Sequence, residues 1–417
     1  CIRDSVEGVP AALYDSTFSL QKDVLYYKIR EYAAACRANK MEETAMEASK
    51  VYYTDFRCPV GTSLLDKLRR VCIAAGIKDI DMDGKFVAIK MHFGELGNLG
   101  FLRPNYAKVV VDTLKDMGAR PFLTDCNTLY TGMRRNALDH LTAAFENGFG
   151  PLQTGCHVII ADGLLGNDHV SVPIDGEYCK EALIGRAAMD ADAIISLTHF
   201  KCHEGTGIGG ALKNLGMGLG STAGKRAMHC DGKPVVDHDK CIGCGMCARQ
   251  CAHGAISFSG EKGHRRATID HDKCVGCGRC VGACRDRGAI QGPDSSNDVL
   301  NCKIAEYAWA VIKDRPNFHI SLVMDVSPYC DCHPENDTPI IADVGMFASF
   351  DPVALDVACA DACNRMEPLP GTFLTDRKNR TGDIFNDTHP YTNWRSGVEH
   401  AAKLGVGSLE YELIEVR

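Results

Sequence analysis

Two runs of cysteine residues share a spacing that suits metal clusters. The runs are CIGCGMCARQC and CVGCGRCVGAC, and both follow the pattern C-x2-C-x2-C-x3-C. A cubane cluster needs four thiolates, and where two such runs occur together the fourth cysteine of each run ligates the other cluster. We therefore predict two [4Fe–4S] clusters. The ligands that this rule assigns are Cys241, Cys244, Cys247 and Cys284 for cluster 1, and Cys274, Cys277, Cys280 and Cys251 for cluster 2.

A pair of zinc sites is the alternative interpretation of these cysteines, since doubled C-x2-C pairs also bind zinc. A third cysteine two residues further on, and a fourth after three more, is far more typical of iron–sulfur proteins. The spacing therefore favours clusters over zinc.

The two runs also form an internal repeat, HDKCIGCGMC against HDKCVGCGRC. The segment closely resembles two-cluster bacterial ferredoxins, which implies a small α+β domain. It departs from them in one respect, because Ala252 and Arg285 replace the usual proline after each run. Residues 231–292 hold ten Lys or Arg and seven Asp or Glu, whereas free electron-shuttle ferredoxins are usually acidic. This balance favours a module that relays electrons within its own chain.

The sequence around this segment predicts the scaffold that positions it. Short apolar runs alternate with helical stretches, a pattern that favours a mostly parallel sheet with helices on both faces. The predicted strands are 50–55, 85–93, 120–125, 156–162, 192–200, 318–325 and 339–343, and the predicted helices lie near 62–76, 104–118, 134–147, 178–190, 297–313 and 352–366. We thus predict an α/β fold interrupted by a ferredoxin domain. The predicted parts are an N-terminal helical extension (1–49), the first α/β part (50–229), the ferredoxin (230–293) and the second α/β part (294–417).

Polar residues follow the ends of six of the predicted strands, all except 50–55, and strand ends are where open α/β sheets bind ligands. We predict acid–base or anion-binding roles for His199, Lys201, His203, Glu95 and Asp125. An additional metal site is predicted from His92, Cys202, Cys330 and Cys332. We expect residues 92–95, 199–204 and 330–333 to lie together near a cluster. The alternative for Asp125, Asp162 and Asp343 is that each caps the next helix.

A glycine-rich stretch, GTGIGGALKNLGMGLG (205–220), follows one of these strand ends. It contains G-x-G-x-x-G between a strand and a helix, which suits phosphate binding. No second strand with an acidic end follows about 20 residues later, as a dinucleotide site requires. We therefore expect close backbone packing beside a cluster, with Lys213 and Asn214 facing an anionic ligand.

Four separated motifs together resemble a known family, the uncharacterised iron–sulfur centre proteins. The motifs are KMHFGELGN (90–98), TDCNTLYTGMR (124–134), THFKCHEGTGIGGALKNLGMG (198–218) and PYCDCHPENDTPIIADVGMFASFDPVALD (328–356). This family is a domain of unknown function that is widespread in anaerobes and often carries an inserted two-cluster ferredoxin. The resemblance covers about residues 50–417 and implies a redox setting without a settled activity.

Three functions remain open on this evidence. The first is an oxidoreductase whose clusters pass electrons to a ligand at the strand ends. The second is a pure electron-transfer protein whose α/β domain docks a partner enzyme, and the third is a protein that handles a metal or a third cluster, since thiolate and imidazole suit Fe–S, Zn or Ni. The partner is therefore a redox protein or a small-molecule substrate.

Composition bounds the setting in which the chain works. The net charge is −8, which does not suit a nucleic-acid binder. We find no apolar run long enough to span a membrane. The 22 cysteines in a long chain do not match a small disulfide scaffold and indicate a reducing cytoplasm. Because the given sequence starts at Cys1, anchoring as a lipoprotein is the alternative.

Overall fold

The computed structural model describes residues 48–229, 233–261, 265–274, 279–284, 287–291, 296–377 and 380–417. Residues 1–47 of the predicted N-terminal extension lie outside the described residues, and so does the predicted cluster ligand Cys277.

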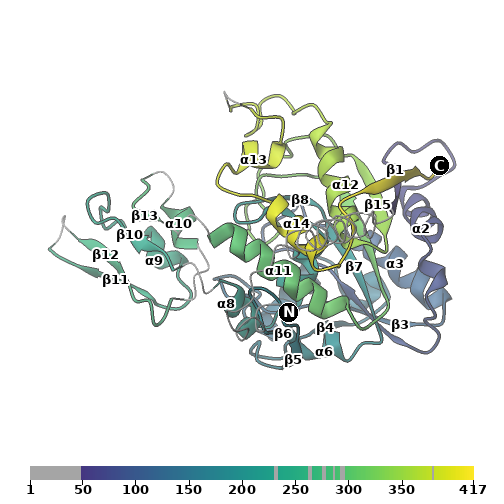
Figure 1. Ribbon diagram of the computed structural model, residues 1–417, viewed down its shortest axis with the longest axis horizontal. Coiled ribbons are helices and arrows are strands. Elements are labelled where there is room, and N and C mark those ends of the chain that lie inside the picture. The colour runs from purple at the N-terminus through teal and green to yellow at the C-terminus, as the bar shows by residue number, and fades with distance from the viewer. Residues whose placement is uncertain are drawn as a thin grey trace, which may run out of the picture. The chain divides into compact units, whose positions relative to one another are not determined.

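An eight-stranded sheet forms the centre of the α/β part (Figure 1). Its strand order is β16 (Tyr411–Glu415), β1 (Ser49–Asp55), β15 (Gly345–Ser349), β14 (Asn317–Val323), β7 (Ala193–His199), β2 (Phe86–Lys90), β3 (Arg120–Asp125) and β4 (Val158–Ile160). Only β15 among these eight runs antiparallel to its neighbours. The predicted mostly parallel α/β sheet is therefore confirmed, and the carboxyl ends of β14, β7, β2, β3 and β4 meet at one edge.

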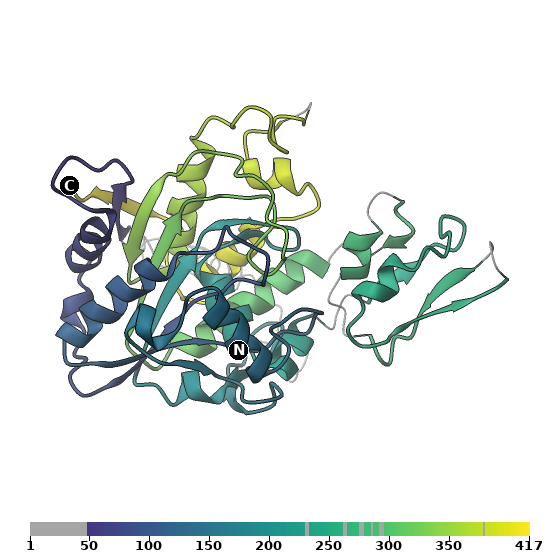
Figure 2. The same cartoon turned by 180° about the vertical axis from the view of Figure 1, so that it is seen from behind.

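Helices cover both faces of the sheet (Figures 1 and 2). The longer ones are α2 (Leu64–Ala74), α3 (Pro104–Asp116), α4 (Ala137–Glu146), α7 (Ala211–Leu219), α8 (Thr222–His229), α11 (Ser296–Ile312), α12 (Pro352–Asn364) and α14 (Arg395–Lys403). The short ones are η1 (Ile77–Asp79), α5 (Pro151–Thr154), α6 (Arg186–Met189) and α13 (Ile384–Thr388). Successive side chains of β7 point to opposite faces: Ile194 packs in the same core as α7 and α11, and Ile195 packs in the core of α2 and α3.

Two predicted elements are wrong. The stretch 178–190 is not one helix, because it forms β6 (Glu181–Gly185), which pairs with β5 (His169–Pro173), and then the short α6. Its helix-forming residues are overridden by pairing, since Ala182 and Ile184 are buried with the period of a strand. The stretch 339–343 is not a strand of the sheet either. Ile341 makes one isolated bridge to Pro368, and the position beside β14 belongs to β15.

The glycine-rich stretch contains a small hairpin that the sequence analysis did not predict. It consists of β8 (Lys201–His203) and β9 (Gly207–Gly209) and immediately precedes α7. Gly207 has a φ of 80°, a conformation that favours glycine at this turn.

The ferredoxin segment has its own small elements and its own small core. They are β10 (Val235–Val236), α9 (Met246–Gln250), β11 (Ile256–Ser259), β12 (Arg266–Ile269), α10 (Arg279–Ala283) and β13 (Ile290–Gln291). β10 pairs with β13, and β11 pairs with β12. Within the described ranges of the whole chain, no helix is both long enough and apolar enough to cross a membrane.

Candidate functional site

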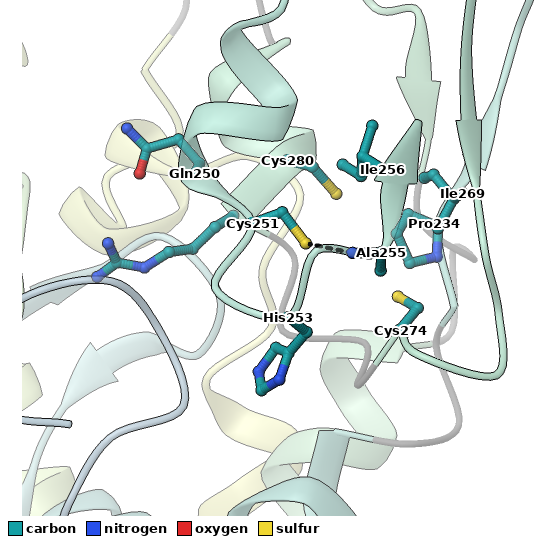
Figure 3. Close-up of a pocket in the computed structure, with 10 residues that line it drawn as sticks. Pro234, Gln250, Cys251, His253, Ala255, Ile256, Ile269, Cys274 and Cys280 are labelled. Atoms are coloured by element: carbon teal, nitrogen blue, oxygen red, sulfur yellow. Dashed lines mark hydrogen bonds between the residues drawn. The ribbon is translucent and has the colours of Figure 1, made fainter. Parts of the chain in front are cut away.

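The predicted cluster ligands gather in two cysteine-lined cavities of the ferredoxin segment. One cavity is lined by Cys241, Cys244, Cys247 and Cys284. The other is lined by Cys251, Cys274 and Cys280 (Figure 3). The structure therefore brings the fourth cysteine of each run to the opposite run, as ligand exchange between two clusters requires.

Backbone amides point at the sulfur atoms in both cavities. Ala267 N donates to Cys241 Sγ, and Ala255 N donates to Cys251 Sγ (Figure 3), each at 3.4 Å. Such N–H···S contacts stabilise thiolate charge and tune the potential of a cluster. Grouped thiols with amide donors fit the iron–sulfur chemistry that the sequence predicts.

The second cavity adjoins the strand-end edge of the α/β part through its own lining residues. His253 Nε2 lies 3.0 Å from the carbonyl oxygen of Leu129. Arg279 Nη2 donates to the carbonyl oxygen of Cys332 at 3.2 Å, and its guanidinium lies 3.7 Å from the centre of the Tyr130 ring. His253 lies two residues after Cys251, and Arg279 directly precedes Cys280. The second cavity therefore lies close to the loops after β3 and β14.

A buried charge network forms at the ends of β2 and β3. Lys90 Nζ lies 3.1 Å from Asp125 Oδ1, and Arg134 Nε lies 3.1 Å from Glu95 Oε2. Burial raises the pKa of Asp125, but the cations Lys90 and Arg134 outweigh it and hold that pKa below its usual value. Glu95 and Asp125, both predicted acid–base groups, are therefore carboxylates already paired with cations.

A second network forms where β7 meets the loop after β14. Asp331 accepts from Lys201 Nζ at 2.9 Å and lies 2.8 Å from His199 Nδ1. The other ring nitrogen of His199 lies 2.7 Å from the carbonyl oxygen of Met324. Burial raises the pKa of Asp331, yet His199 and Lys201 more than offset this and lower it. The structure thus brings residues 199–201 together with 330–333, and Glu95 N joins them by donating to Asp331 O at 2.8 Å.

The two cysteines that flank Asp331 form a disulfide, Cys330–Cys332. A ring nitrogen of His203 lies within 4.8 Å of both sulfur atoms, and Glu204 and His333 lie equally close to Cys330 Sγ. Glu204 Oε1 and His333 Nε2 are 2.6 Å apart. Burial raises the pKa of Glu204, but the hydrogen bond from His333 brings it well below its usual value.

Two residues of the predicted metal site do not join this group. Cys202 is fully buried and packs in the apolar core on the face opposite Lys201 and His203, because side chains alternate along β8. His92 Nδ1 accepts from Gly94 N at 3.0 Å, and the group that contains Cys330 and Cys332 includes His203 in its place. The predicted metal set of His92, Cys202, Cys330 and Cys332 is therefore not assembled as a unit.

The backbone N–H groups at the start of α7 already donate to a side chain of the same protein, that of Asp356. Asp356 accepts from Ala211 N at 2.6 Å and from Leu212 N at 3.0 Å. The glycines of this helix serve packing, since a Cβ on Gly216 would lie 2.1 Å from Ile304 O of α11. The glycine-rich stretch thus packs closely as expected, but against α11 and not beside a cysteine cavity.

Lys213 and Asn214 have different surroundings on this helix. Asn214 is engaged within the protein, because its amide group bonds to Lys90 and to Thr198. Lys213 Nζ has no hydrogen bond or ion pair among the described residues, and burial together with Lys201 lowers its pKa to about 7. Only Lys213 of the two is therefore available to a ligand.

The helix-cap alternative for the three strand-end aspartates is wrong. Asp125 pairs with Lys90, Asp162 accepts from Asn127, and Asp343 accepts from Asp325 N. Helix starts in the described residues are capped instead by the side chains of Ser63, Asn136, Ser221, Asp351 and Asp383, and by Asp356 at α7.

Sequence reasoning did not assign roles to Arg279, Arg134 or Asp356. Each lies far in sequence from its partner, so spacing carries no signal for it. Asp331 carried a weak signal, because it stands between two cysteines at a strand end.

A family described as "Domain of unknown function (DUF362)" matches residues 87–361, more than half of the chain. The chain belongs to this family. The match includes the strand-end residues described above and the ferredoxin segment. The expected membership in a domain of unknown function is therefore confirmed.

A relative and two solved structures were also found for this DUF362 protein. An uncharacterized ferredoxin of Methanocaldococcus jannaschii is 35% identical over 70 residues, which make up 17% of this chain and 46% of that ferredoxin. The chain thus matches less than half of the length of that ferredoxin. The lactate racemase apoprotein of Thermoanaerobacterium thermosaccharolyticum is 14% identical, with a TM-score of 0.29 over 66% of this chain and 51% of that one. A Thermotoga maritima protein is 12% identical, with a TM-score of 0.36 over 72% of this chain and 58% of that one.

Proposed function

We propose that this DUF362 protein is an iron–sulfur oxidoreductase that relays electrons from two [4Fe–4S] clusters to an acceptor at the strand ends. The observation that carries the proposal is the contact of Arg279 with the Cys332 carbonyl oxygen. Arg279 lines the second cysteine cavity and adjoins Cys280, so one side chain links a predicted cluster ligand to the strand-end site. When bound, the clusters supply and accept single electrons.

The cysteines divide between the two cavities as follows. Cys241, Cys244, Cys247 and Cys284 would hold cluster 1, and Cys251, Cys274, Cys277 and Cys280 would hold cluster 2. The amides of Ala267 and Ala255 stabilise thiolates of the two sets. The positive charge of Arg279 beside the second set favours the more negative, reduced state.

Electrons enter from a redox partner at the first cavity in this proposal. Cys244 is exposed there, and the apolar side chains of Ile242 and Met246 at the same cavity are 49% and 47% exposed. Exposed apolar side chains beside a redox centre suit a transient contact with another protein. Residues that line the second cavity contact the strand-end loops. A cluster held in the first cavity would therefore pass electrons through one held in the second cavity to the acceptor.

Hydrogen-bond donors at the strand ends favour an anionic acceptor that carries oxygen atoms. Lys213 offers an ammonium group without a partner among the described residues. His92 and His203 each accept backbone N–H groups at Nδ1, which leaves Nε2–H as a donor. The Nε2 donor of His203 lies 3.8 Å from Glu204 Oε2. Burial lowers the pKa of both histidines well below the usual value, so they donate as neutral imidazoles. An ammonium group and two N–H donors together suit a carboxylate or phosphate.

The test uses the full chain, reconstituted with iron and sulfide under anaerobic conditions. Iron content should be about eight per chain with the EPR signals of reduced [4Fe–4S] clusters. The reduced protein is then mixed with a panel of carboxylates and phosphates, and cluster oxidation is followed by visible absorbance. We expect an anion that oxidises the wild type and the Arg249→Ala control at equal rates, and Arg279→Ala and Lys213→Met at least about tenfold more slowly.

Two results would support other functions. If no small molecule oxidises the clusters but a protein acceptor does, the chain is an electron-transfer protein. Stoichiometric zinc or nickel, or iron well above eight per chain, would favour the metal-handling alternative, for which His203, Cys330 and Cys332 are the nearest grouped ligands.

A further inference from the structure

We infer that the Cys330–Cys332 disulfide is redox-active and is the first two-electron acceptor of the relay. The inference rests on the proposed function, because it names the group that receives the electrons of the clusters. It assigns to these two residues a role other than the metal ligation that their sequence pattern suggested.

The disulfide lies beside the second cysteine cavity. Arg279 joins Cys280 of the second cavity to the backbone of Cys332 through a hydrogen bond of 3.2 Å. No other disulfide occurs among the described residues. The one oxidised pair of the described chain therefore lies next to the cavity predicted to hold cluster 2.

The chemical surroundings of the disulfide also support the inference. Cys332 N donates to Cys330 Sγ at 3.4 Å, a contact that stabilises a thiolate once the disulfide is reduced. A ring nitrogen of His203 lies within 4.8 Å of both sulfur atoms. Reactive cysteines occur in such polar surroundings with basic side chains nearby.

The other buried cysteines of the α/β part show the contrast. Cys359 and Cys363 lie one helical turn apart in α12 and are fully buried in an apolar core. Burial raises the pKa of both thiols well above the usual value, which makes them poor nucleophiles. They remain free thiols, so proximity of two cysteines alone does not define the site.

The disulfide needs as many electrons as two one-electron clusters would supply. Reduction of the disulfide breaks one S–S bond and forms two S–H bonds, which consumes two electrons and two protons. Cys241, Cys244, Cys247 and Cys284 would hold one cluster, and the second set of cysteines would hold another. Two such one-electron centres would together supply the two electrons that the disulfide needs. Glu204 and His333 each have a proton-carrying atom within 4.8 Å of Cys330 Sγ, and both side chains are partly exposed to solvent, which supplies the protons.

Thiol labelling of the reconstituted full chain tests the inference. The protein is purified anaerobically, reduced with photoreduced deazaflavin, denatured in N-ethylmaleimide and digested for mass spectrometry. We expect the peptide with Cys330 and Cys332 to carry no label before reduction and two labels after it. The peptide with Cys359 and Cys363 is the internal control and should carry two labels in both samples. The Cys280→Ser variant, which lacks a predicted ligand of cluster 2, should lose the change at Cys330 and Cys332.

A reductive titration gives an independent measurement. The wild type should take up about four electrons per chain, two in the clusters and two in the disulfide. The Cys330→Ser/Cys332→Ser double variant should take up about two, with unchanged cluster spectra. Two labels before reduction, or none after the clusters are reduced, would overturn the inference while the relay itself stands. Clusters that fail to assemble or to accept electrons would instead refute the proposed function.

Discussion

The ferredoxin segment and the α/β part differ in what holds them together. The segment has a core of six buried residues, and three of the six are the predicted ligands Cys241, Cys247 and Cys280. The α/β part has two large apolar cores, and its strand ends carry buried charges that are paired within the chain. A small segment whose core consists largely of thiols needs its cofactor for stability. The α/β part supplies its own partners and should fold without one.

Removal of iron is the strongest way to test this difference. We expect the apo chain to lose amide protection throughout residues 233–261 and 265–274, because too little apolar area remains buried there. Strands β7 and β14 should keep their protection. Hydrogen–deuterium exchange with mass spectrometry compares the two parts in one sample. Equal loss of protection in both parts would show that the α/β part also depends on the clusters.

Removing Asp331 should produce the next largest effect. Asp331→Ala leaves Lys201 and His199 buried without their carboxylate, and breaking a buried pair in this way costs about 3–5 kcal/mol. The free energy of unfolding from urea titration measures this. The exposed pair Glu177–Lys403 offers a matched control, since Glu177→Ala should leave unfolding almost unchanged. A small effect of Asp331→Ala would mean that the α/β part does not rely on its internal charge pairs.

Acid should destabilise the α/β part through its buried histidines. Burial lowers the pKa of His140 and of His319 to about 3, whereas an unfolded histidine titrates near about 6.5. Below the latter pH the unfolded chain binds more protons than the folded one, so stability falls as pH drops. Each such histidine contributes a slope of about 1.4 kcal/mol per pH unit.

Urea titrations between pH 7 and pH 5 check this slope. His140→Phe should lower the slope of unfolding free energy against pH by about the contribution of one histidine. The substitution breaks no hydrogen bond, because the ring nitrogens of His140 have no hydrogen-bond partner among the described residues. The exposed His157 is the control, and His157→Gln should leave the slope as it is. A slope that does not change in His140→Phe would show that this ring is charged in the folded protein.

The two parts also differ in how far the sequence could predict them. The cysteine runs are local, so their spacing alone placed Cys241 and Cys284 in one predicted set. The alternation of strands and helices predicted the sheet and indicated that Glu95, His199 and Cys330 would meet at its edge. Partner choice could not be predicted, because Arg279 and Cys332 lie 53 residues apart and neither carries a motif for the other. The β5–β6 hairpin was missed because residues 178–190 favour helix locally and only tertiary pairing makes them a strand.

The smallest predicted effect concerns Asp356. Its side chain occupies the N–H groups at the start of α7, where a phosphate could otherwise bind. Its carboxylate accepts from Ala211 N and Leu212 N, yet burial raises its pKa to about 7. Since the folded pKa lies above the unfolded one, the contribution of this group to stability is largest in acid and declines as pH rises through 7. Asp356→Asn keeps one acceptor and should cost about 1–2 kcal/mol at pH 5. That cost should shrink by pH 8 in urea titrations, because the wild type must then bury a charge that asparagine does not carry. If the cost of Asp356→Asn instead grows with pH, the N–H groups at the start of α7 stabilise the ionised carboxylate more than burial destabilises it. The start of α7 would then be an anion-binding site that the side chain of Asp356 occupies.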